Sequence, residues 1–181
     1  MAAPTLTGPR VVLRAPRESD LAARQELGWH RQIERGYGAS RQDASASPDD
    51  ARQWFRYVTE GLPAETSWVI EVDGALAGVA NLHHLSEPDR NAMFAIGMLS
   101  PTFIGCGLGV ESSRLVLRHA FTSLGLEPPI AFIGESYSDR TMLSMAIKAN
   151  AEYRAWASAG DLEAFLTLAS AAMAKLANKD R

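Results

Sequence analysis

The chain has 181 residues, 46% of them hydrophobic, with 18 Lys or Arg against 21 Asp or Glu and a formal net charge of −3. This length and apolar fraction predict a single domain over 1–181 with a substantial core. The acidic balance disfavours a nucleic-acid surface, and no apolar run approaches the ~18 residues of a membrane span. Cys106 is the only cysteine, and the N-terminus lacks the basic start and apolar core of a secretory signal, so we expect a cytoplasmic protein.

The first third of the sequence predicts a strand and two helices. A strand at 10–14 is followed by a helix at 20–28, with Ser19 or Asp20 as its N-cap. Residues 29–50 are polar and have no clear period, so we expect them to be irregular. Pro48-Asp49-Asp50 then opens a helix that runs to about residue 60.

The remainder predicts an α+β fold, with a mixed, mostly antiparallel central sheet flanked by helices. Asp73-Gly74 is typical of a hairpin turn. Gly125 and Pro128-Pro129 are typical of the end of a helix. The expected elements are strands at 67–73 and 76–83, a loop at 83–91, a strand at 92–99, a loop-helix unit at 101–124, a strand at 130–135, a helix at 139–149, strands at 152–157 and 162–168, and a helix at 170–181.

Gly105, Gly107 and Gly109 stand between an expected strand and an expected helix. Glycines let the backbone approach a ligand, and a helix N-terminus presents free N–H groups to an anion, most often a phosphate. One glycine would serve a tight turn, so three glycines favour a phosphate-binding loop. The dinucleotide fingerprint needs Gly or Ala where Val110 stands, and the nucleoside-triphosphate loop needs a Gly-Lys pair that is absent here.

The segment Ile96-Gly97-Met98-Leu99-Ser100-Pro101-Thr102-Phe103-Ile104-Gly105-Cys106-Gly107-Leu108-Gly109-Val110-Glu111 resembles the acyl-CoA loop of the GNAT N-acetyltransferases. In that family a strand leads into Gly-x-Gly-x-Gly or Ala and then a helix. The version here is most similar to the ribosomal-protein-alanine branch, which acetylates N-terminal amines. Residues 6–20, 68–82 and 131–153 resemble other family segments in the same order, across about 5–168, with 170–181 as a helical tail.

The resemblance implies an acyl-CoA N-acyltransferase fold that uses acetyl-CoA and no metal. The thioester carbonyl would lie against the backbone of Met98 or Leu99, and the pyrophosphate against the N–H groups of the loop. Ile104 and Cys106 stand where the family usually has basic or aromatic side chains, so the loop carries no cation of its own. The implied cofactor-binding residues are Met98, Leu99, Ile104, Gly105, Cys106, Gly107, Leu108, Gly109, Val110, Ser138 and Asp139.

Proton transfer has three candidate residues. Ala95 stands at a strand position where the family often has a glutamate base. Tyr137 could protonate the departing thiolate, while Glu135 or His84 could accept a proton from the amine. Strand alternation sends one of His83 and His84 inward. Each candidate also has a structural interpretation, as a packed tyrosine, a solvated glutamate or a hydrogen-bonded wall histidine.

The expected activity is acetyl transfer from acetyl-CoA to a primary amine by direct attack in a ternary complex. An α-amino group has a pKa of about 7.7 and a lysine about 10.4, so a site with a weak base favours the α-amine of a protein N-terminus. The alternatives are a small-molecule amine, such as an antibiotic or a polyamine, and a catalytically degenerate CoA-binding module. Residues 29–50 and 83–91 would select the acceptor. A homodimer is one expected assembly, whereas nucleic acid and membranes are not expected partners.

Overall fold

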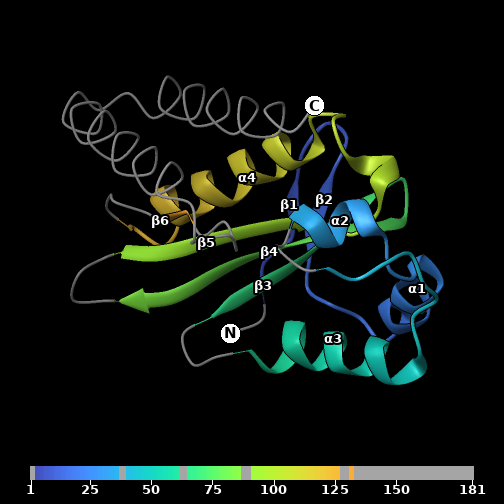
Figure 1. The fold of residues 1–181 in the computed structure, drawn as a ribbon. Helices are drawn as coiled ribbons and strands as arrows, with labels where there is room; N and C mark the ends of the chain where they lie inside the picture. Colours follow the sequence, from blue (N-terminus) through green and yellow to red (C-terminus); the bar gives the residue numbers. More distant parts are fainter. Residues whose placement is uncertain (1–2, 37–39, 62–64, 87–90, 127–130, 133–181) are drawn as a thin grey trace.

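The computed structural model describes residues 3–36, 40–61, 65–86, 91–126 and 131–132 (Figure 1). The expected helices at 139–149 and 170–181, the strands at 152–157 and 162–168, and the Pro128-Pro129 stop lie outside these residues.

The described strands form one sheet in the order of the sequence. Every neighbouring pair is antiparallel except the last, in which β6 runs parallel to β5. This arrangement confirms the predicted mixed, mostly antiparallel sheet. The strands are β1 (Leu6–Thr7), β2 (Val12–Arg14), β3 (Thr66–Val72), β4 (Ala75–Ser86), β5 (Asn91–Met98) and β6 (Ala131–Phe132).

Helices lie on both sides of this sheet. Helix α4 packs along one face, while α1 and α3 pack against each other and against β4 and β3 on the other side (Figure 1). None of the helices in the described ranges is long and apolar enough to cross a membrane. The helical elements are α1 (Ser19–Leu27), α2 (Arg31–Gly36), α3 (Pro48–Glu60), the 3-10 turn η1 (Pro101–Phe103) and α4 (Leu108–Thr122).

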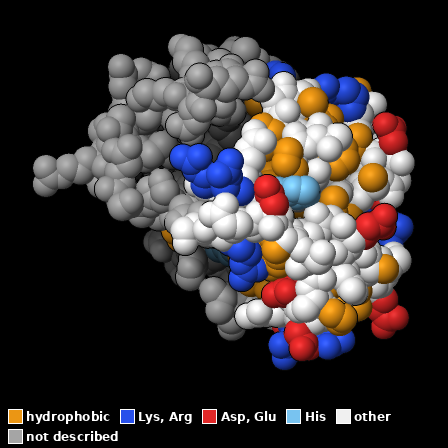
Figure 2. Space-filling model, turned by 45° about the vertical axis from the view of Figure 1, so that its right-hand side comes forward, with side chains coloured by type: hydrophobic (Ala, Val, Ile, Leu, Met, Phe, Trp, Pro, Cys, Tyr) orange, Lys and Arg blue, Asp and Glu red, His pale blue; other side chains and the backbone are white. Residues whose placement is uncertain are grey.

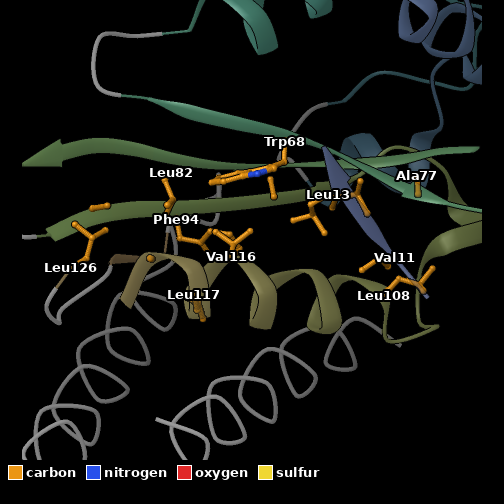
Figure 3. Close-up of a cluster of buried hydrophobic side chains, with 14 residues drawn as sticks. Val11, Leu13, Trp68, Ala77, Leu82, Phe94, Leu108, Val116, Leu117 and Leu126 are labelled. Carbon is orange, nitrogen blue, oxygen red and sulfur yellow. The ribbon is translucent and has the colours of Figure 1, made fainter. Parts of the chain in front are cut away.

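Alternation along the strands decides what faces α4. Trp68 on β3, Leu82 on β4 and Phe94 on β5 project toward α4, where Val116 meets them in the core (Figure 3). Burying side chains of this size stabilises the fold by roughly 1.5–3 kcal/mol each. Neighbouring positions along the same strands therefore face the opposite side of the sheet.

The expectation that residues 29–50 are irregular is wrong, because helix α2 forms there. Trp29 anchors the segment: its backbone bridges to Ala44, and the guanidinium groups of Arg24 and Arg41 lie 4.3 Å and 3.8 Å from its ring centroid. These contacts join positions far apart in the sequence. Helix α2 has only six residues, too few for a hydrophobic periodicity that would predict it.

The predicted cap of α1 is also wrong, since Glu18 is its N-cap and makes no side-chain cap hydrogen bond. Asp20 instead receives hydrogen bonds from the Arg14 guanidinium at 2.8 Å and 2.9 Å and from the Arg17 backbone N–H at 2.7 Å. Burial raises the pKa of Asp20, but these hydrogen bonds outweigh it, so that its pKa lies below the ordinary value. Arg14 on β2 also donates to Glu71 on β3 at 2.6 Å, while its bonds to Asp20 tie α1 to the sheet.

The β3–β4 hairpin confirms the predicted turn. Asp73 and Gly74 have φ of +50° and +80°, the left-handed pair that a two-residue hairpin turn requires. β4 continues past residue 83, and Ser86 pairs with Asn91. The expected loop at 83–91 is therefore shorter than predicted, because the hairpin pairing extends toward its tip.

Candidate functional site

The glycine loop takes the backbone shape that its sequence predicts. After β5, the Ser100 hydroxyl accepts a hydrogen bond from the Thr102 N–H at 3.3 Å and starts η1. Gly105 and Gly107 both have φ of +77°, a left-handed conformation that is costly for residues with a Cβ. Gly107 is the N-cap of α4, so the loop leads directly into the helix N-terminus.

The first turn of α4 offers unpaired backbone donors. The Glu111 N–H donates to the Gly107 carbonyl at 3.0 Å, and the N–H groups of Leu108, Gly109 and Val110 come before this bond and have no intrahelical acceptor. A Cβ placed on Gly109 would meet no atom of the described residues within 4 Å. The backbone is therefore open to a ligand here, and the helix dipole favours an anion.

A clamp from the β1–β2 connection holds the loop. Arg10 donates through Nη1 to the Cys106 carbonyl and through Nε to Glu111 Oε2, both at 2.8 Å. Glu111 Oε1 accepts from the backbone N–H groups of Arg10 at 2.8 Å and Val11 at 3.2 Å. Gly8 lies so close that an added Cβ would stand 2.7 Å from Glu111 Oε1. We call Gly8, Arg10, Val11 and Glu111 the loop clamp.

The sequence prediction missed this clamp. The sequence offered one signal: the loop has no basic residue, so a cation could come from another segment. Arg10 stands 96 residues before Cys106, however, and nothing in the sequence joins the two. Cys106 itself is exposed, and its Sγ lies 3.7 Å from the carbonyl oxygens of Thr102 and Ile104.

The end of β5 distinguishes between the two residues expected at the thioester. The Leu99 N–H donates to the Ala77 carbonyl at 2.9 Å and is therefore occupied. Because N–H groups alternate across a strand, those of Met98 and Ile96 point away from β4. They point to the side on which β6 pairs with Met93 and Phe94.

Gly78 allows β4 to approach β5 closely at this point. Gly78 pairs with Met98, and a Cβ on Gly78 would lie 2.5 Å from the Gly97 carbonyl oxygen and 3.3 Å from the Met98 Cα. Any larger residue would push the two strands apart. The sequence showed this glycine only as one of many.

A short polar row lies on the face of the sheet opposite α4. Asn81 pairs with Ala95, and His83 lies two residues further along the same face of β4. His83 Nδ1 stands 2.8 Å from Glu65 Oε1, and both side chains are buried. Asn81 is 3% exposed, and its Oδ1 has no hydrogen-bond partner among the described residues. His83 is thus the inward histidine, whereas the side chain of His84 lies outside the description.

Four of the predicted site residues come after Phe132 in the sequence. Tyr137, Glu135, Ser138 and Asp139 lie outside the described residues. Within the described part, no three His, Cys, Asp or Glu side chains gather as metal ligands would.

A shallow depression between α1 and α3 is lined by Leu21, Phe55 and Arg56, away from the glycine loop. On the face drawn in Figure 2, acidic and basic side chains of the described residues are interspersed rather than separated by sign.

Known proteins resemble this chain in sequence and in fold. The spermidine N(1)-acetyltransferases of Escherichia coli strains K12 and O157:H7 are each 35% identical over 63 residues, which is 35% of this chain and about a third (33%) of the relative. An acetyltransferase from Agrobacterium tumefaciens superposes with a TM-score of 0.52 at 18% identity, over 70% of this chain and 71% of that one. A candidate ribosomal-protein-serine acetyltransferase from Vibrio cholerae superposes with a TM-score of 0.54 at 14% identity, over 70% and 72%.

These structural likenesses show the fold alone, an antiparallel sheet with flanking helices. Residues 10–139 match the family model described as the acetyltransferase (GNAT) domain. That range includes the loop clamp from Arg10 onward, the hairpin, the glycine loop and α4. The chain belongs to the GNAT acetyltransferase family.

Proposed function

We propose that this protein transfers an acetyl group from acetyl-CoA to a primary amine in a ternary complex. The observation that carries the proposal is the glycine loop, whose N–H groups at Leu108, Gly109 and Val110 stand open at a helix N-terminus. These groups would hold the pyrophosphate, together with the backbone of Ile104, Gly105, Cys106 and Gly107. The Met98 N–H would support the thioester carbonyl, since the Leu99 N–H is already used.

The reaction requires two proton transfers. The acceptor amine first loses a proton, and its nitrogen then forms a bond to the thioester carbon. The C–S bond breaks, and the CoA thiolate takes up the proton that the attacking nitrogen releases, through Tyr137 in our proposal. Glu135 and His84 are the proposed acceptors of the first proton, and His83 joins them because it is buried beside Glu65.

We propose an α-amine as the acceptor. About a tenth or more of an α-amine is already neutral at pH 7, whereas a lysine would need a strong base. Ala95 supplies none, and its cross-strand neighbour Asn81 is an amide rather than a carboxylate. We also propose, from the sequence alone, that the protein belongs to the ribosomal-protein branch, is cytoplasmic and forms a homodimer.

A polyamine is the second candidate acceptor. The E. coli relatives act, by their names, on spermidine, and they are 35% identical over the matched segment. This chain spans only about a third (33%) of their length in that match, so their substrate supports the alternative without extending to this protein directly.

The experiment is a thiol-release assay with acetyl-CoA against peptides with free N-termini, polyamines and aminoglycosides. We expect turnover with peptides and a single rise in kcat/KM near the α-amine pKa. Turnover with spermidine but not with peptides would support the polyamine alternative. CoA binding by calorimetry with no turnover on any acceptor would identify a degenerate binding module, and no CoA binding would refute the proposal.

A further inference from the structure

We infer that Arg10 is a positioning residue for the donor: by holding the Cys106 carbonyl, it aims the Gly107 N–H at the pyrophosphate. The inference rests on the proposed use of acetyl-CoA and assigns a role to a residue outside the glycine loop. Arg10 lies in the β1–β2 connection, and its side chain is 54% exposed.

Peptide geometry links the two groups. In a planar trans peptide the C=O and the following N–H point in opposite directions. Arg10 Nη1 donates to the Cys106 carbonyl at 2.8 Å, so that carbonyl faces the guanidinium and the Gly107 N–H faces away from it. Among the described residues this N–H has no hydrogen-bond acceptor. It therefore remains available to a ligand on the open side of the loop.

The loop needs such a constraint because a glycine stands on one side of this peptide. Gly107 lacks the steric restriction that would hold one value of φ, so the Cys106–Gly107 peptide could turn over without the Arg10 contact. Fixing the orientation before binding removes an ordering cost that the ligand would otherwise have to meet. One hydrogen bond to the Cys106 carbonyl is enough to select the orientation.

Glu111 fixes Arg10 in turn. Its carboxylate accepts from Arg10 Nε and from the backbone N–H groups of Arg10 and Val11, and its side chain is only 14% exposed. The carboxylate also offsets much of the guanidinium charge. We therefore assign Arg10 an orienting role rather than that of the cation missing from the loop.

The test compares two donors in the full-length protein. Arg10→Met keeps the apolar stem and removes the donors. We expect its kcat/KM for acetyl-CoA to fall at least tenfold through a higher KM, with kcat within twofold. For S-acetyl-N-acetylcysteamine, a thioester without phosphates, kcat/KM should stay unchanged. Arg10→Lys, with one donor group, should fall between Arg10→Met and the wild type.

Two further variants sharpen the result. Glu111→Gln should shift the KM for acetyl-CoA in the same direction, and the double variant should be no worse than Arg10→Met, because the two residues act as one unit. Arg17→Met removes a cation whose side chain lies outside the loop clamp and should match the wild type. Thermal melts monitored by circular dichroism establish that each variant is folded.

Equal losses with both donors would overturn the inference, because a general structural effect would then explain them. An unchanged KM for acetyl-CoA would overturn it as well. If the wild type binds CoA without turnover, the same comparison uses the Kd of CoA against that of pantetheine. A wild type that binds no CoA refutes the proposed function itself, a result distinct from an active wild type that is insensitive to Arg10.

Discussion

Adding one methyl group at Gly107 should weaken both the fold and donor binding. Gly107 has φ of +77°, and its added Cβ would meet only Arg10 Nη2, at 3.4 Å. The neighbour is the end of a flexible side chain, so steric overlap contributes little. The left-handed backbone is the main cost, about 1–2 kcal/mol for a residue with a Cβ.

The same change at Gly109 should act differently. Its φ is not positive, no atom in the described part of the chain lies within 4 Å of the added Cβ, and it stands in the first turn of α4. Alanine favours a helix over glycine by up to ~1 kcal/mol. The family loop accepts Ala at this third position, so donor binding should persist. Gly107→Ala should therefore lower Tm and Gly109→Ala raise it, by about 2–4 °C per kcal/mol in a domain of this size.

Gly107→Asn separates backbone strain from loss of the Arg10 contact. Asparagine enters the left-handed region more readily than alanine, so the Tm of this variant should lie closer to that of the wild type. Its side chain starts from a Cβ that stands 3.4 Å from Arg10 Nη2, so it would displace the guanidinium from the Cys106 carbonyl, and we expect at least a tenfold weaker Kd for acetyl-CoA, about 1.4 kcal/mol. Thermal melts and calorimetry measure both effects. If Gly107→Asn melts normally and binds acetyl-CoA as the wild type does, the Arg10 contact does not orient the loop for the pyrophosphate.

Three further predictions concern the scaffold. Arg14→Met leaves the buried Asp20 carboxylate without its cation; urea unfolding should show a loss of about 3–5 kcal/mol, and a loss under 1 kcal/mol would contradict this. Gly78→Ala should push β4 away from β5 beside Met98 and lower the free energy of unfolding by about 1–3 kcal/mol. It should also lower kcat more than it weakens CoA binding. An unchanged kcat would count against the proposed position of the thioester. Burial lowers the pKa of His119, so the unfolded chain binds more protons and stability should fall as pH drops below about 6.5. His119→Gln should reduce that slope in urea midpoints compared between pH 5 and 7.5, and an identical slope would show that His119 does not cause it.

The sequence predicted correctly several features that depend on residues close together in the chain. Asp73-Gly74 predicts its hairpin because two left-handed residues close such a turn. The helix expected from Pro48 to about residue 60 forms as α3, since Ser47 and Asp50 cap each other's backbone N–H groups within one turn. The glycine spacing likewise identified the loop before α4 and, with the family resemblance, its proposed ligand.

Contacts between residues far apart in the chain determine the features that the sequence pattern did not predict. Helix α2 depends on Trp29, which Ala44 and Arg41 reach from beyond the helix. His83 stands beside Glu65 because the register of β3 against β4 selects which residues share a face.

By itself, the sequence determined the β3–β4 hairpin, α3 and the glycine loop before α4, because these features arise from residues close together in the chain. Only the tertiary structure brought Arg10 to the loop, across 96 residues to Cys106 and 101 to Glu111. It also assigned the Leu99 N–H to Ala77. The physical reason is that these hydrogen bonds depend on how the strands and α4 pack together, and no pattern within a single segment encodes that packing.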